Sequence, residues 1–373
     1  GDLAVSDFNN DGLIDLLVTG IKADNSKVTE LYKNHGSFNF SKLSSAFPGV
    51  AVGGVSFIHL THDGKADIII SGQNNSNQRI TQVYQNNGNE TFTLITTGIT
   101  GTSNGDLLVD DFNNDSYDDV LITGFNSSNS RVTRLYLNNG DNSFTLTPTV
   151  LPLLQSGGIA SADINADGFI DVFVSGSDSG GANTAKVYTS NAGAGFVLLK
   201  SLSPAVNGGG AWGDFNNDGL PDLALFGFNN PDLNGIVYEN SGGSDLVDSG
   251  NTLPGFSSGV AAWADYNHDN KLDLLLSGSG VVPFTSLYSS SISVWNTNPG
   301  VPSNLSSTGY ADSLVLAWDA PADDETASAG LTYEIRIGTS PGAMNILSPL
   351  TDKTNGIRKV ARGGGIRGTS FVV

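Results

Sequence analysis

Several residue types are absent or scarce in this chain. Its 373 residues include no cysteine, one methionine, four histidines, and only 17 Lys and Arg against 37 Asp and Glu. The absence of cysteine excludes disulfides, thiolate zinc sites and thiol catalysis. The formal charge of -20 argues against a nucleic-acid partner, because phosphate binding needs a basic surface. No apolar run approaches the ~20 residues of a membrane span, so we expect no membrane insertion.

An acidic segment of nine residues recurs six times. Its copies are 51 or 52 residues apart and begin at Asp7, His59, Asp111, Asp163, Asp214 and Asp265. An apolar run precedes each copy. An aliphatic run, a run centred on tyrosine and an alternating run follow it. Four short β-type runs per unit, separated by Gly, Asn, Asp and Ser, predict four antiparallel strands joined by hairpins. Helices should be nearly absent, because no segment keeps a 3.6-residue period.

The repeats predict an all-β fold in which residues 1–297 form a β-propeller of four-stranded blades. Six blades are visible. A seven-bladed ring stays open as an alternative, because residue 1 already lies inside a repeat and we expect the chain to be a trimmed or processed piece. The period stops near residue 297, and alternating runs at 314–318 and 331–337 predict a small β-sandwich over residues 298–373. At about 75 residues this second domain should be incomplete.

The recurring pattern Asp-x-Asn-x-Asp-Gly-x-x-Asp places side-chain oxygens at positions 1, 3, 5 and 9, with a backbone carbonyl expected at position 7. Hard oxygen ligands from one tight loop favour Ca²⁺ over Mg²⁺. Glycine at position 6 permits a sharp turn, and Ser116 and Asn270 at that position should loosen two copies. We predict five calcium sites, with these ligands: Asp7, Asn9, Asp11, Leu13 and Asp15; Asp111, Asn113, Asp115, Tyr117 and Asp119; Asp163, Asn165, Asp167, Phe169 and Asp171; Asp214, Asn216, Asp218, Leu220 and Asp222; Asp265, Asn267, Asp269, Lys271 and Asp273.

The second copy departs from the pattern. It offers His59, Thr61, Asp63 and Asp67, so its site should be weak or empty. In the other five copies, fifteen aspartates would repel one another without cations, and five Ca²⁺ would move the formal charge from -20 to about -10. The alternative is that Asx-rich loops only form turns. Helix-flanked loops of the EF-hand or dockerin kind are disfavoured, because strands follow these loops.

These residues carry a family resemblance. The units resemble FG-GAP/VCBS repeats, the blades of integrin-α-like propellers, whose calcium loops have this form. The resemblance implies calcium binding and a ring that usually closes with seven blades. The C-terminal part resembles a fibronectin type III module through Pro302, Leu305, Trp318 and Tyr333.

Little in the sequence suggests catalysis. Three of the four histidines, His59, His62 and His268, lie in the acidic loops. Few histidines therefore remain that could form an active site. Asp110 and Asp118, beside the third loop, are interpreted as solvated hairpin acids. Trp212 and Trp263 could stack on sugars, but their strand position favours packing between blades.

The sequence therefore predicts a non-enzymatic, calcium-stabilised module for binding, adhesion or assembly. We expect it to be extracellular, secreted or on the surface of a bacterial cell, with a protein or glycan ligand. Self-association is a further prediction, because an incomplete β-sandwich exposes strand edges that another copy could pair with, giving oligomers or filaments. The alternatives are a carbohydrate-binding propeller and a lyase or hydrolase with its active site on the propeller face.

Overall fold

The computed structural model describes residues 1–44, 47–229, 231–251, 253–294, 297, 299–310, 313–323, 326–340, 343, 345–348 and 366–372. Nearly all the regular structure in this part of the chain is antiparallel β-sheet. One 3₁₀ turn, Ser328–Gly330, is the only helical element of the described residues. The prediction of an all-β chain nearly free of helices is confirmed.

Six units of antiparallel strands follow one another along the chain. In each unit the first strand leads into the acidic loop, and the second strand begins at the last residue of that loop. The strands of the six units are β1 (Asp2–Ser6), β2 (Asp15–Ile21), β3 (Lys27–Asn34) and β4 (Phe40–Lys42); β6 (Val55–Ile58), β7 (Asp67–Asn74), β8 (Arg79–Asn86) and β9 (Phe92–Ile95); β10 (Leu107–Asp110), β11 (Asp119–Phe125), β12 (Arg131–Asn138) and β13 (Phe144–Thr147); β14 (Ile159–Ala162), β15 (Asp171–Ser177), β16 (Asn183–Ser190) and the start of β17 (Phe196–Gly213); the end of β17, β18 (Asp222–Asn229), β19 (Asp232–Ser241) and β20 (Asp245–Asp248); β21 (Ser257–Ala264), β22 (Asp273–Ser279) and β23 (Pro283–Tyr288).

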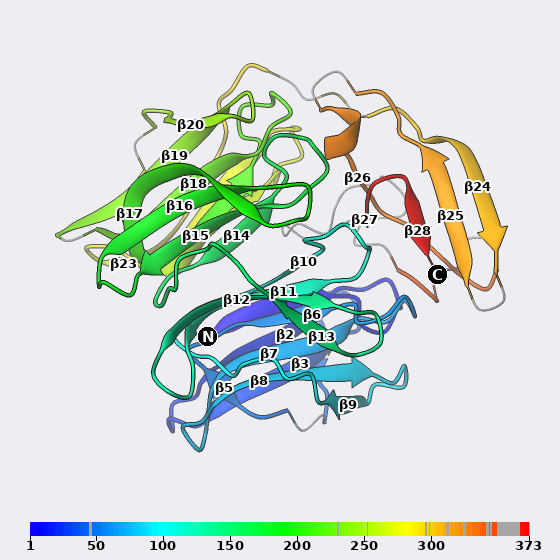
Figure 1. Ribbon diagram of the computed structural model, residues 1–373, viewed down its shortest axis with the longest axis horizontal. Helices are drawn as coiled ribbons and strands as arrows, with labels where there is room; N and C mark the ends of the chain where they lie inside the picture. The colour runs from blue at the N-terminus through cyan, green and yellow to red at the C-terminus, as the bar shows by residue number, and fades with distance from the viewer. Residues whose placement is uncertain are drawn as a thin grey trace.

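Two connections join neighbouring units into continuous sheets. The short strand β5 (Val50–Ala51) pairs with both β3 and β7, and β17 passes from the outer edge of the fourth unit to the inner edge of the fifth. The predicted four strands are present in the first five units. The described residues of the sixth unit contain three, so the prediction of a fourth strand is not met there. Figure 1 shows the units in two groups, β1–β13 below and β14–β23 above.

The apolar core lies between successive units. Five clusters of buried side chains each join one unit to the next. The second strand of a unit contributes to two of them, since Ile68 and Ile70 pack towards the first unit while Ile69 packs towards the third. Alternate side chains of a strand point to opposite faces, and here both faces are covered by neighbouring sheets. This is the packing of propeller blades.

The sixth unit has an uncovered outer face. At one position of the second strand, Leu17, Ile69, Leu121, Phe173 and Ala224 are 0–2% exposed in the first five units, and each packs towards the following unit. The equivalent Leu275 is 39% exposed, because no further unit of the described chain packs on it. The number of blades in a closed ring stays a prediction.

The C-terminal part forms two small sheets. Strands β24 (Ser303–Gly309), β25 (Leu314–Asp319) and β28 (Ser370–Val372) make one sheet, and β26 (Thr332–Tyr333) pairs with β27 (Ile366–Arg367) in the other. They lie to one side of the blades in Figure 1.

The predicted strand at 331–337 was too long. Only β26 forms there, because beyond it the described residues supply one further backbone pairing, between Ile337 and Leu347. The aromatic rings of Trp318 and Tyr333 do pack together, edge to face at 5.1 Å. The fibronectin-like assignment and the boundary at residue 298 stay predictions.

Candidate functional site: the acidic loops and an adjoining cavity

Each complete acidic loop curls around the aspartate at its first position. In the first loop, Asp7 Oδ1 accepts the backbone N–H of Asp11 at 3.0 Å, and Asp7 Oδ2 accepts that of Gly12 at 2.6 Å. The same two bonds recur in the third to sixth loops. The side chains at positions 3 and 5 accept further amides, as Asn9 and Asp11 do here. These are the turn-forming bonds expected of Asx-rich loops.

The residue at position 6 adopts a left-handed conformation in all six loops, with φ between 61° and 88°. Glycine does so without a steric penalty, whereas Ser116 does so at a cost of about 1 kcal/mol or more. Asn270 tolerates this region better than serine does. The predicted need for a sharp turn at this position is confirmed.

The aspartate at position 9 is the most buried acid of each loop, at 0–1% exposed in all six copies. In the third loop, Asp119 Oδ2 accepts the N–H of Phe112 at 2.9 Å, and Oδ1 accepts that of Asn138 at 2.8 Å. Equivalent pairs of bonds occur in every other loop. This carboxylate therefore ties the start of its loop to the end of the third strand.

Burial makes these carboxylates unusually basic. Burial, helped by the neighbouring charges of the same loop and opposed by the backbone hydrogen bonds, raises the pKa of Asp119 to about 8 and that of Asp15 to about 7. The acids at positions 1, 5 and 9 are thus close enough to repel one another. A divalent cation would neutralise this charge, and the donors are the oxygens that Ca²⁺ prefers. Among the described residues, no three His, Asp or Glu side chains form a ready-made metal cage.

The second loop is held together differently. Lys65 Nζ lies 2.7 Å from Asp63 Oδ2, so an ammonium group sits beside the carboxylate at position 5. His59 does not turn towards its own loop, since its backbone N–H and Nδ1 lie 2.7 and 3.1 Å from Asp118 Oδ2 of the third unit. Desolvation lowers the pKa of His59, but Asp118, Asp67 and Asp63 together raise it above the usual value.

The interpretation of Asp110 and Asp118 as solvated acids was wrong. Asp118 binds His59, and Asp110 accepts a hydrogen bond from Ser161 Oγ of the next unit at 2.7 Å. Both acids join neighbouring blades, which the sequence could not show because their partners lie more than 50 residues away.

The packing predicted for Trp263 is confirmed, because its ring is stacked 6.1 Å from that of Phe215. Trp212 likewise packs against the cluster between the fourth and fifth units.

A set of buried asparagines was missed by the sequence reasoning. Asn86 Nδ2, at the end of the third strand of its unit, donates to the carbonyl of Phe8 in the preceding unit at 2.8 Å. Asn138 and Asn240 make the same bond to Leu60 and Ile164. All three are 2% exposed. The Asn-Gly turns at these positions were visible in the sequence, but they indicated only hairpins.

Replacing Asn86 by alanine should cost more stability than replacing Asn34. Both residues bond to their own loop through the backbone and side chain, but only Asn86 reaches the preceding blade. Losing that bond leaves the Phe8 carbonyl buried without a donor, which costs about 1–2 kcal/mol. Urea unfolding of Asn86→Ala and Asn34→Ala measures the difference. Equal losses would show that the contact between blades contributes nothing.

Neighbouring loops are also connected directly. Asn10 Nδ2, at position 4 of the first loop, donates to the carbonyl of Gly64 in the second at 2.9 Å. Asn114 and Asn217 make the same contact with the following loops, and His62 Nε2 lies 3.1 Å from the Ser116 carbonyl. The six loops therefore do not behave as separate turns, because several share hydrogen bonds with the next.

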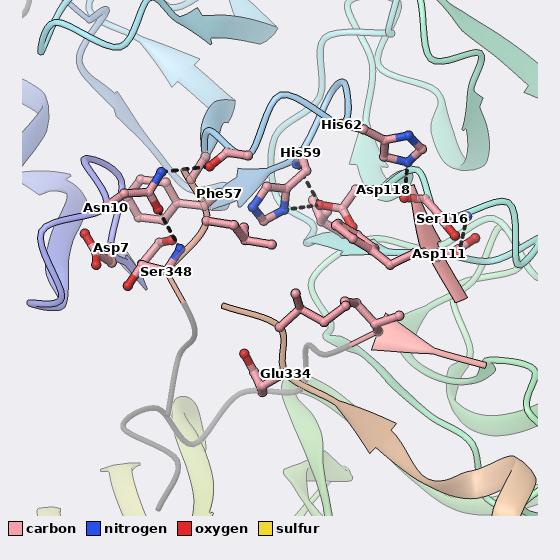
Figure 2. A pocket seen from close by; sticks show the side chains of 18 of the residues that line it. Asp7, Asn10, Phe57, His59, His62, Asp111, Ser116, Asp118, Glu334 and Ser348 are labelled. Atoms are coloured by element: carbon pink, nitrogen blue, oxygen red, sulfur yellow. Dashed lines mark hydrogen bonds and ion pairs between the residues drawn. The ribbon is translucent and has the colours of Figure 1, made fainter. Parts of the chain in front are cut away.

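A cavity of about 250 Å³ adjoins the first three loops (Figure 2). One side consists of the ends of β1, β6 and β10 and the start of each following loop. The other side consists of C-terminal residues, including Tyr333, Glu334 and Phe371.

Asn10 connects the loop side of the cavity to the C-terminal side by two hydrogen bonds. Its Nδ2 donates to the Ile346 carbonyl and its Oδ1 accepts the N–H of Ser348, both at 2.9 Å. The Ser348 side chain also hydrogen-bonds to Asp7. The C-terminal part thus contacts a predicted metal ligand directly.

The fold and the loops together define a protein of β-propeller blades, each with an acidic loop between its first and second strands. Residues 7–70, 111–174, 163–225 and 214–276 match the FG-GAP-like repeat family. Each match begins at the first aspartate of a loop, and together they span more than half of the chain. The chain belongs to the FG-GAP-like repeat family.

No curated protein matches the sequence. Among solved structures, a mutant of the Aleuria aurantia lectin in complex with α-methyl-L-fucoside aligns at a TM-score of 0.41 and 10% identity, over 88% of this chain and 97% of the lectin chain. Similarity at this level bears on neither ligand nor mechanism. In the described part of the chain, no helix has the length and hydropathy that a membrane span requires.

Proposed function

We propose that this protein is a non-enzymatic binding module of the extracellular space or cell surface, whose blades are stabilised by calcium. The observation that carries the proposal is the buried carboxylate at position 9, which recurs in every loop beside two further acids in five of them. Buried charge of one sign requires a counter-charge, and five bound cations would provide it.

In the proposed sites the five complete loops hold Ca²⁺ through their acids, the asparagine oxygen at position 3 and the backbone carbonyl at position 7. The ion supplies positive charge that fixes the loop and its two strands. Extracellular calcium-binding modules typically have a Kd of about 10⁻⁴–10⁻³ M, and we expect affinities in this range here. The second loop should remain without metal, because Lys65 already neutralises Asp63.

Counting bound calcium tests this proposal. Isothermal titration of the chelator-treated protein should give about five Ca²⁺ per chain. Asp11→Asn and Asp63→Asn change the same loop position in the first and second copies. We expect Asp11→Asn to remove one equivalent and Asp63→Asn to remove none. Absence of calcium binding, or equal losses in the two variants, would contradict the assignment.

Within this proposal the partner is a protein or glycan, and the blades position the loops and hairpins as a rigid contact surface. Self-association is a second candidate function, favoured by β24. This strand forms the edge of its sheet, all seven of its residues are exposed, and Leu305 in it is 76% exposed. An open edge without charges is a site for strand pairing between chains.

Sedimentation velocity in calcium tests self-association. We expect oligomers that grow with concentration and that Leu305→Lys abolishes, because a charged edge resists pairing. A monomer at every concentration would rule out assembly through this edge while leaving the calcium proposal intact.

A further inference from the structure

A short C-terminal segment, residues 345–348, has a defined seat on the first two acidic loops. Asn10 Nδ2 donates to the carbonyls of Gly64 and Ile346, both at 2.9 Å, so one amide group joins the two loops to the segment. Asn10 Oδ1 accepts the N–H of Ser348 at 2.9 Å. A Cβ atom on Gly64 would lie 2.4 Å from the Ile346 carbonyl oxygen, so only glycine fits there. The backbone of the segment therefore lies directly against that of the second loop.

Ser348 extends from this segment to the first aspartate of the first loop. Its side chain hydrogen-bonds to the carboxylate of Asp7, and Figure 2 shows the two residues next to each other beside Asn10. Burial raises the pKa of Asp7, and the hydrogen bond from Ser348 is the largest effect that opposes this rise. The ionised carboxylate is the form that binds a metal ion. Ser348 therefore favours the metal-binding form of Asp7.

The third and fifth loops have no partner of this kind among the described residues. Asp111 and Asp214 hold the loop position of Asp7, and each accepts backbone N–H groups of its own loop but no hydrogen bond from a side chain. Asn114, the counterpart of Asn10, donates to the following loop at 2.8 Å, but no hydrogen bond joins it to the described C-terminal residues. Of these three loops, only the first is completed by a distant part of the chain.

We propose that Ser348 and Asn10 are positioning residues for calcium in the first loop, so that calcium binding there and docking of residues 345–348 strengthen each other. Ser348 orients the Asp7 carboxylate, and Asn10 holds Ser348 in place. Groups that orient a metal ligand typically contribute 10–100-fold in metal affinity. Coupling between two binding events is reciprocal, so calcium stabilises the docked segment by the same factor. This inference rests on the proposed calcium sites and makes one of them dependent on the C-terminal part.

A double-mutant cycle assigns the effect to the first loop. Calcium is titrated into the whole chelator-treated chain against a competing fluorescent chelator. We expect Ser348→Ala to weaken one of the five equivalents about tenfold and to leave the other four unchanged. Asp11→Asn removes the first site, so Ser348→Ala should have no further effect on calcium affinity in that background. Ser307→Ala is the matched control, because it makes the same change on an exposed residue of β24 and should affect no site.

Hydrogen exchange measures the reciprocal effect on the segment. In peptides that contain residues 345–348, calcium should slow amide exchange about tenfold. Asn10→Ala and Asn114→Ala both remove a bond to the following loop, but only Asn10→Ala removes the bonds to the segment. We expect Asn10→Ala to abolish the slowing by calcium and Asn114→Ala to retain it.

The two proposals fail in different ways. Five calcium equivalents that Ser348→Ala leaves unchanged would overturn the positioning role and leave the calcium sites intact. An effect of Ser348→Ala that persists in Asp11→Asn would also overturn it, because the affected site would then lie outside the first loop. Exchange of the segment that is equal with and without calcium would contradict the coupling. A chain that binds no calcium would contradict both the sites and the positioning role.

Discussion

Removing calcium with EDTA should lower the melting temperature of this protein by about 10 °C or more. A ligand present at ten times its Kd stabilises the folded state by about 1.4 kcal/mol per site, so five sites contribute about 7 kcal/mol. In a domain of this size each kcal/mol shifts the melting temperature by roughly 2–4 °C. Without cations, the three carboxylates of each complete loop also repel one another, as those around Asp15 and Asp119 do. Differential scanning calorimetry with and without chelator measures the shift.

Magnesium provides the control for this experiment. It requires near-octahedral geometry and gives up its water reluctantly, so it should restore little of the lost stability. Calcium added back in excess should restore all of it. A melting temperature that EDTA leaves unchanged would mean that hydrogen bonds alone stabilise the loops. This is the alternative, left open by the sequence, that the loops only form turns.

Replacing Asp119 by alanine should be among the most destabilising single changes in the chain, even in chelator. The side chain is fully buried and accepts the N–H groups of Phe112 and Asn138. Each donor left without an acceptor costs about 1–3 kcal/mol, so we expect a loss of about 3–5 kcal/mol. Urea unfolding with EDTA present separates this structural role from any role in metal binding.

Asp115→Ala is the matched control, because it removes another carboxylate of the same loop. Asp115 is exposed and accepts only local hydrogen bonds, from the backbone N–H of Tyr117 and from Asn113 Nδ2, so its replacement in chelator should cost under about 1 kcal/mol. In calcium, Asp115→Ala should become more destabilising, since it then also removes a proposed calcium ligand. If the two variants were equally stable without calcium, the position-9 carboxylate would have no structural role of its own.

Much of this structure was predictable from local sequence. The 51- or 52-residue spacing gave the units, and runs of Val, Ile, Leu and Phe flanked by Gly and Asn gave most of the strands. These features depend on residues near one another in the chain. Most of the strand expected at 331–337 did not form. Whether a β-type run becomes a strand depends also on a partner strand from a distant part of the chain, which the local sequence does not reveal.

The contacts between units were not predictable in the same way. Nothing beside Asn86 in the sequence indicates that its side chain reaches Phe8, and nothing beside Asp118 points to His59. The exposure of Leu275 could not be foreseen either, because its sequence context matches that of buried residues in the other units. Such facts depend on which units pack against one another across the fold.

The sequence alone therefore determined the repeat, the all-β character and the acidic composition of the loops, because strand and turn preferences act over a few residues. Only the tertiary structure decided which carboxylates are buried, which loops share hydrogen bonds and where the C-terminal strands enclose a cavity beside Asp7 and His59. The physical reason is that burial and charge pairing depend on distances across the fold, and residues brought together there can be more than 300 positions apart, as Asn10 and Ser348 are.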